Sequence, residues 1–369
     1  MSQEIEIGLG KKGRLAYSLD DVSIVPSRRT RDPQDVSTSW QVDAYEFDVP
    51  VIGAPMDSVT SPATAIAMGK MGALGVLDLE GLWTRYDDPQ PLLDEIAQLS
   101  ADKATERIQQ IYAEPIKPEL IVERLHEIRD AGVTVAGALS PQRTQDYYST
   151  VLEAGVDLFV IRGTVVSAEH VSKDHELKKF IYDLDVPVIV GGAANYTAAL
   201  HLMRTGAAGV LVGFGGGAVS ANRNTIGVHA PMATAIADVA EARRDYMDES
   251  GGRYVQVIAD GGMGDSGSFV KAFALGADAV MLGSPLARAS EAPGKGMHWG
   301  AEARHQTLPR GFRTNVGTVG SLQEVMFGPS HNADGTTNFV GALRRAMATT
   351  GYVDLKSFQR CPVTVASSH

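Results

Sequence analysis

The chain has 369 residues, of which 33 are Lys or Arg and 44 are Asp or Glu, so its net charge at pH 7 is −11. This acidic balance disfavours a nucleic acid partner, and the single cysteine, Cys361, excludes intramolecular disulfides, four-cysteine zinc sites and cysteine-ligated iron–sulfur clusters. No apolar run approaches the ~20 residues of a membrane span and the polar N-terminus is unlike a signal peptide, so we predict a cytoplasmic globular protein with no membrane partner and no metal site.

One junction recurs along the chain: a helix end, a glycine, a small residue and a short apolar run. It occurs at residues 71–76, 131–135, 154–158, 205–210 and 275–280. Each glycine suits the left-handed conformation that ends a helix, and the run after it suits a strand buried on both faces. Helical spacing precedes several junctions, at residues 118–129, 197–204 and 266–275.

Three further strands are predicted at residues 49–54, 187–191 and 254–259. The strand centres then lie near residues 52, 75, 135, 159, 189, 210, 257 and 280. Eight buried strands alternating with helices are typical of a (β/α)8 TIM barrel. A doubly wound open sheet alternates in the same way, and of the two α/β folds we favour the barrel.

The remaining segments are interpreted as additions to a single barrel domain spanning residues 1–369. An acidic helical insertion is predicted at about 79–131, after the second strand. A glycine-rich loop and a helix at 232–249 occupy the gap after the sixth strand. Glycine and proline mark a C-terminal surface excursion at about 285–369, with a mobile loop at 327–337 before a last helix at 339–349.

Glycines follow the last two strands, where barrels commonly bind phosphate. The seventh strand continues into Asp260, Gly261 and Gly262, and the eighth into Gly283 and Ser284, each before a helical stretch. Free N–H groups and positive helix ends there suit a phosphate dianion, and Asp260 suits ribose hydroxyls. The alternative is that these glycines only permit tight turns, and we favour the phosphate site.

A third loop, residues 213–223 (GFGGGAVSANR), is rich in glycine. Its three consecutive glycines allow the backbone to approach a ligand closely. A flexible linker is the alternative, but a buried strand before the loop and a helix after it argue against that.

Four ordered motifs resemble the IMP dehydrogenase/GMP reductase family, from about residue 15 to 357. They are residues 19–26 (LDDVSIVP), 54–60 (APMDSVT), 258–262 (IADGG), and 280–284 (VMLGS) with 291–294 (EAPG). The resemblance implies a (β/α)8 barrel, a homotetramer or octamer, an NAD(P) cofactor and a purine nucleoside monophosphate (IMP, GMP or XMP) as ligand. It assigns nucleotide and phosphate binding to Met56, Gly217, Asp260, Gly261, Gly262, Met281, Gly283 and Ser284. The CBS regulatory module of typical dehydrogenases is expected to be absent, as in a short IMP dehydrogenase-related branch.

The chain departs from this family at its catalytic loop. The family uses a cysteine thiolate that attacks purine C2, and the matching position here is Ser220. Asn222 replaces a Thr of the same loop, and Ala218 replaces a phosphate-loop Ser. Cys361 lies in the tail and is interpreted as a packing residue or a surface thiol.

Further departures affect the cofactor and the base. Arg162 stands where the family has the Asp that positions the nicotinamide half of the cofactor, and Gly192 and Arg310 replace base-reading residues. Landmarks of a long mobile flap match residues 298–300 and 309–311, leaving only 301–308 between them. Eight residues are too few for the flap that carries the water-activating pair, so hydrolysis of a covalent adduct is not expected.

The resemblance to the family's motifs implies that five basic residues lie near the barrel mouth: Arg162, Arg223, Arg304, His305 and Arg310. They form either a cluster for a more anionic ligand or local ion pairs with carboxylates such as Asp57, Asp260 and Glu302.

Three hypotheses follow. We favour a purine-nucleotide-binding paralogue with lost or altered catalysis, which senses nucleotides or assembles with an active IMP dehydrogenase. The alternatives are an NAD(P)-dependent oxidoreductase acting on IMP or GMP, and an enzyme with changed chemistry that uses Ser220, Asn222 or Arg223 in new roles.

Overall fold

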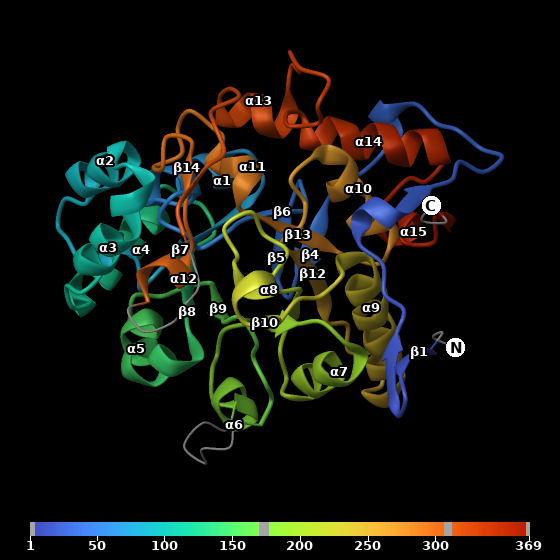
Figure 1. Cartoon of the computed structure of the whole chain (residues 1–369), viewed down its shortest axis with the longest axis horizontal. Coiled ribbons are helices and arrows are strands. Elements are labelled where there is room, and N and C mark those ends of the chain that lie inside the picture. Colours follow the sequence, from blue (N-terminus) through green and yellow to red (C-terminus); the bar gives the residue numbers. More distant parts are fainter. Residues whose placement is uncertain (1–3, 170–176, 306–311, 367–369) are drawn as a thin grey trace.

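Eight parallel strands close into a barrel, so the fold is the (β/α)8 barrel and not the open sheet (Figure 1). A computed structural model describes residues 4–169, 177–305 and 312–366. The barrel strands are β6 (Val51–Gly53), β7 (Leu74–Asp78), β8 (Ala136–Leu139), β9 (Leu158–Arg162), β10 (Val188–Ala193), β11 (Gly209–Val212), β12 (Gln256–Asp260) and β13 (Ala279–Leu282). Each predicted strand centre falls within or next to one of them.

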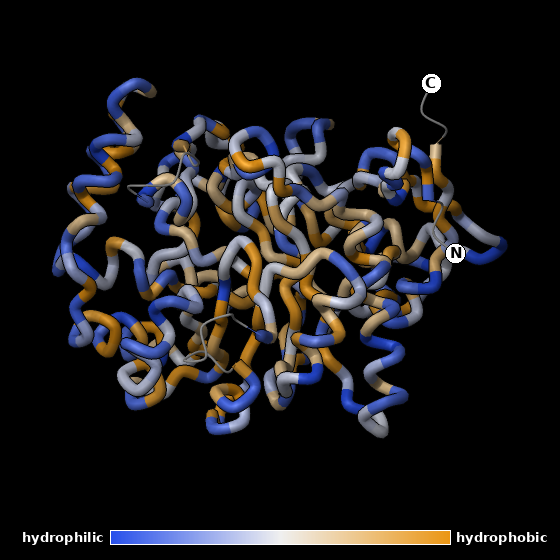
Figure 2. The backbone as a smooth tube through the Cα atoms, turned by 60° about the horizontal axis from the view of Figure 1, so that its bottom comes forward, coloured by the Kyte–Doolittle hydropathy of each residue, from blue (hydrophilic) through white to orange (hydrophobic). Residues whose placement is uncertain are grey.

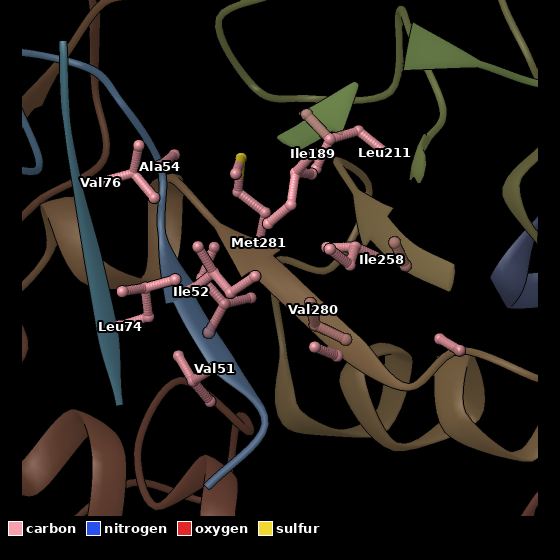
Figure 3. Packing of buried hydrophobic residues seen from close by; sticks show 14 of the residues in the cluster. Val51, Ile52, Ala54, Leu74, Val76, Ile189, Leu211, Ile258, Val280 and Met281 are labelled. Atoms are coloured by element: carbon pink, nitrogen blue, oxygen red, sulfur yellow. The ribbon is translucent and has the colours of Figure 1, made fainter. Parts of the chain in front are cut away.

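The last barrel strand pairs with the first, which closes the sheet. Met281 of β13 lies opposite Ile52 of β6. Apolar side chains from the barrel strands form one core cluster, and Figure 3 shows Leu74, Ile189 and Ile258 among them. Since both faces of each strand are covered, the strands are continuous apolar runs instead of alternating ones.

Helices surround the barrel, and in Figure 2 hydrophilic and hydrophobic residues alternate along the outer segments, whereas the central strands are largely hydrophobic. The surrounding helices are α1 (Pro62–Lys70), α4 (Pro118–Asp130), α5 (Pro141–Glu153), α6 (Leu177–Tyr182), α7 (Tyr196–Arg204), α9 (Met232–Glu249), α10 (Ser266–Ala274) and α14 (Phe339–Thr350). No helix of the described segments is both long and apolar enough to cross a membrane.

The insertion after β7 contains η3 (Leu82–Thr84), α2 (Gln90–Gln98) and α3 (Ala101–Ile111). The prediction of about 79–131 was too long at its end, because α4 packs between α1 and α5 as a helix of the barrel itself. The insertion has its own small apolar core, in which Leu93, Ile96 and Ile108 contact Trp299 from the far end of the chain.

The remaining elements are short. They are β1 (Glu4–Gly8), β2 (Lys11–Arg14), η1 (Leu19–Asp21), β3 (Val22–Ile24), η2 (Pro33–Asp35), β4 (Trp40–Val42), β5 (Tyr45–Phe47), α8 (Asn222–Thr225), α11 (Ser284–Ala287), β14 (Met297–His298), α12 (Ala301–Arg304), β15 (Thr314–Asn315), α13 (Leu322–Phe327), α15 (Leu355–Phe358) and β16 (Val363–Val365). Strand β16 pairs with β3, so the C-terminal excursion returns to the N-terminal segment. Cys361 is buried just before it, which favours the packing role over a surface thiol.

Candidate functional site

A cavity of about 360 Å³ lies at the C-terminal ends of the barrel strands. Every residue that the sequence assigned to the site lines it: Met56, Arg162, Gly217, Ser220, Asn222, Asp260, Gly261, Gly262, Met281, Gly283 and Ser284. A larger hollow of about 790 Å³ lies on the outside of the barrel, beside α6 and α7, away from these strand ends. The strand-end cavity is therefore the candidate site.

Two glycine loops meet at one side of this cavity. A Cβ placed on Gly261 would lie 3.4 Å from the amide nitrogen of Gly217, so the loops after β11 and β12 are nearly in contact. Gly261 and Gly262 have φ of 95° and 83°, a conformation that favours glycine. Within the described part of the chain, the amides of Gly216, Gly217 and Gly262 donate no hydrogen bond. Amides without partners around a concave loop pair can bind an anion.

The helix after β12 differs from the expectation that its N-terminus faces the ligand. The amide of Ser266 donates to the carbonyl of Gly335 at 2.8 Å, and the amide of Ser268 donates to Asp265 Oδ1 at 2.9 Å. The first turn of α10 is thus already capped. Because α11 has only four residues, the loop amides, and not helix dipoles, are the groups here that suit an anion.

Arg162 and Asp260 form an ion pair across the mouth of the barrel. Arg162 Nε donates to Asp260 Oδ2 at 3.0 Å, with the two side chains 22% and 14% exposed. Burial lowers the pKa of the Arg162 guanidinium, but the carboxylate of Asp260 outweighs it and raises the pKa, so Arg162 is a cation. Of the two interpretations of this arginine, local pairing is the one that the structure contains.

Arg304 also pairs locally, but with carboxylates that the sequence did not suggest. It lies 2.9 Å from Asp78 Oδ2 and 3.8 Å from Glu80 Oε2. Asp57 instead accepts from the Tyr112 hydroxyl at 2.5 Å and from the Leu82 amide at 2.9 Å.

The other three basic residues have different surroundings. Arg223 is exposed on α8, the carbonyl of His305 accepts from Gln109 at 3.0 Å, and Arg310 lies outside the described residues.

Ser220 has no base beside it. Its Oγ is buried and has no hydrogen-bond partner in the described segments. Asn222 Nδ2 donates to Glu302 Oε1 at 2.7 Å, and the Thr164 hydroxyl donates to the same oxygen at 3.3 Å. This carboxylate therefore bonds to Asn222 and Thr164, with no contact to Ser220 that would activate the hydroxyl.

Two lining residues, His298 and Arg288, were not selected from the sequence as site residues. His298 Nδ1 lies 2.9 Å from the Ser58 hydroxyl. Burial, together with the nearby charge of Arg162, lowers the pKa of His298 to about 4, so the imidazole is neutral at pH 7. The only sequence signal for His298 was its place in a flap landmark, and Arg288 had none. In the described ranges no group of three or more His, Cys, Asp or Glu is placed to hold a metal ion.

Comparisons with known proteins agree with this geometry. The family model described as IMP dehydrogenase / GMP reductase domain matches residues 16–313. An uncharacterized oxidoreductase of Mycolicibacterium smegmatis is 50% identical, with 98% of this chain and 100% of that protein covered. An inosine-5'-monophosphate dehydrogenase of Thermoplasma acidophilum is 26% identical over 93% of this chain and 90% of its own.

A crystal structure is also similar throughout. It is that of an IMP dehydrogenase/GMP reductase-like protein from Corynebacterium glutamicum, which is 50% identical and has a TM-score of 0.94. The match covers 98% of each chain.

Proposed function

The chain belongs to the IMP dehydrogenase/GMP reductase family, and from that premise we propose that it binds a purine nucleoside monophosphate at the barrel mouth and has lost the family's covalent chemistry. IMP, GMP and XMP are the candidate ligands. The observation that carries the proposal is a contrast within the cavity lining, between the glycine loops and the nucleophile position. Among the described residues, the glycine loops keep amides without partners, whereas the nucleophile position is Ser220, with a buried hydroxyl that bonds to no base.

The residues at the mouth do not fit an NAD(P) cofactor of the oxidised form. Its nicotinamide ring is cationic, and the family resemblance places that ring at Arg162, which is itself a cation. The cavity of about 360 Å³ is also near the lower end of the usual range of about 300–1,000 Å³ for ligand sites. That space favours a mononucleotide alone over a mononucleotide together with a dinucleotide.

We expect IMP, GMP or XMP to raise the melting temperature of the purified protein, as measured by a thermal-shift assay. A ligand at 100 times its Kd stabilises the folded state by about 2.7 kcal/mol. Asp260→Ala should abolish the shift, because it removes the carboxylate that is expected to accept hydrogen bonds from the ribose hydroxyls. Asp238→Ala is the matched control, since Asp238 also pairs with an arginine, Arg14, but far from the cavity. Absence of a shift with all three nucleotides would contradict nucleotide binding.

We expect no absorbance change at 340 nm when the protein is mixed with IMP and NAD⁺ or with GMP and NADPH. The reason is that Ser220 is not ionised near neutral pH and has no base to deprotonate it. Turnover in the wild type that disappears in Ser220→Ala would favour the alternative, an active oxidoreductase with a changed mechanism. Assembly as a homotetramer or octamer, or with an active IMP dehydrogenase, stays a prediction that size-exclusion chromatography with light scattering can check.

A further inference from the structure

Arg288 lines the same cavity as the glycine loops. It directly follows α11 and lines the cavity together with Gly283, Ser284 and Pro285. Its backbone is fixed, because its carbonyl accepts a hydrogen bond from the amide of Val319 at 3.0 Å. The side chain therefore starts from a defined position at the edge of the candidate phosphate site.

The guanidinium of Arg288 has no partner in the part of the chain that the structure describes. Its Nε is buried without an acceptor, and no ion pair joins it to a carboxylate of residues 4–169, 177–305 or 312–366. Asp334 is the acidic residue on which its charge acts, but the Asp334 carboxylate bonds to the amide and hydroxyl of Thr336, at 3.0 and 2.7 Å. A buried N–H without an acceptor costs free energy, and an anion in the cavity would remove that cost.

The other hydrogen-bond donors considered in the cavity lining are neutral or already paired. Amides of Gly216, Gly217 and Gly262 supply donors without a full charge, and Ala218 supplies no hydroxyl. His298 is neutral, and its Nε2 would lie 3.3 Å from a Cβ on Gly283, so it faces the same loop. Arg162 is already paired with Asp260. Arg288 is thus the cation available to a phosphate dianion among the described residues that line the cavity.

We propose that Arg288 is a phosphate-binding residue of this chain, adding one full positive charge to a subsite that is otherwise made of backbone amides and a neutral imidazole. This inference rests on the proposed binding of a nucleoside monophosphate. A guanidinium forms charge-assisted hydrogen bonds with phosphate oxygens that are stronger than those of neutral donors. Arg288 therefore makes the site select nucleotides over nucleosides, through the charge of the phosphate and not through the base.

The test uses isothermal titration calorimetry on the full chain. The first ligand is whichever of IMP, GMP and XMP gives the largest thermal shift, and the second is the corresponding nucleoside. Arg288→Gln is expected to weaken binding of the nucleotide about 10- to 100-fold, since a hydrogen bond to a charged group is lost. Binding of the nucleoside should not change. Arg288→Lys keeps the charge without the fork geometry and should fall in between. Arg345→Gln, on the exposed face of α14, is the matched control.

The wild type should also lose nucleotide affinity as salt rises, more steeply than Arg288→Gln does. Equal weakening of nucleotide and nucleoside in Arg288→Gln would show a structural role and overturn the inference. Unchanged nucleotide affinity in a folded Arg288→Gln would also overturn the inference about Arg288. The proposed function would still stand in that case. If the wild type binds no purine nucleotide at all, both proposals fail together.

Discussion

Arg304→Met is expected to lower the free energy of unfolding by about 3–5 kcal/mol, because it leaves buried carboxylates without their cation. The guanidinium lies 2.9 Å from Asp78 Oδ2 and donates to the Glu80 carbonyl at 2.9 Å. It also lies over the Tyr112 ring, 5.3 Å from the centroid. These carboxylates, with Asp57 beside them, raise the pKa of Arg304 even though burial lowers it, so its positive charge is fixed at every physiological pH. Urea unfolding followed by circular dichroism measures the loss.

Arg204→Met is the matched control for this variant. It breaks an arginine–glutamate pair in which both side chains are about half exposed, 44% for Arg204 and 46% for Glu249. Exposed pairs contribute about 0–1 kcal/mol, so this control should stay near the wild type. Equal losses in the two variants would contradict the view that burial makes the Arg304 pair costly to break.

A double variant separates pairing from packing. Removing Asp78 as well, in Arg304→Met with Asp78→Asn, should recover part of the loss, because no unpaired carboxylate then stays at that position. If the double variant loses as much as the sum of the single ones, the pair does not interact energetically.

The barrel was predictable from the sequence because its signal is local. Each strand is a short apolar run after a helix-ending glycine, and glycines such as Gly155 and Gly276 have the positive φ that this junction requires. The glycine loops at the site were predictable for the same reason. By contrast, the end of the insertion was misplaced, since only the packing of α4 between α1 and α5 shows that it is a barrel helix.

The pairing of charges was only partly predictable: local pairing with Asp260 was one of the two interpretations of Arg162, and the structure contains it. Nothing in the sequence says that Arg304 meets Asp78 and Glu80, because the three come from α12, β7 and the turn after β7 and are brought together only by the fold. Arg288 lies between residues 280–284 and 291–294 of one motif but belongs to neither part, and only the fold shows that its Nε is buried without an acceptor among the described residues. Sequence patterns identify which residue types reach the mouth of the barrel, while the partner of each depends on tertiary contacts.

The insertion is connected to the site through buried polar contacts. Trp299 Nε1 donates to the Tyr112 hydroxyl at 2.9 Å, and Tyr112 in turn donates to Asp57. The next residue, Ser58, bonds to His298 of the cavity wall. The chain segment after α3 thus helps to fix the position of the cavity lining, so the insertion contributes to the structure of the site.

The free energy of unfolding of the wild type is expected to fall as pH rises from about 4 to about 7 because of Asp57. The variant Asp57→Asn should not show this fall. Burial and the neighbouring charge of Asp78 raise the pKa of Asp57 to about 7, although Tyr112, Arg304 and the Leu82 amide oppose the rise. In this window the folded protein keeps a proton on Asp57 that the unfolded chain releases, so the wild type becomes less stable as pH rises. The slope from this group is at most about 1.4 kcal/mol per pH unit.

The measurement is urea unfolding at pH 5, 6, 7 and 8 for the wild type, Asp57→Asn and Asp248→Asn, a control that is exposed on α9. His298 acts in the opposite direction, because its pKa is lowered to about 4 and stability from this group rises with pH up to about 6.5. That contribution is common to all three proteins and cancels in the difference. The free energy of unfolding of Asp57→Asn relative to the wild type should therefore increase from pH 5 to about pH 7 and level off toward pH 8, whereas that of Asp248→Asn stays level throughout. A constant difference for Asp57→Asn would mean that Asp57 is ionised throughout this range, held by Arg304 and its two hydrogen bonds despite its burial.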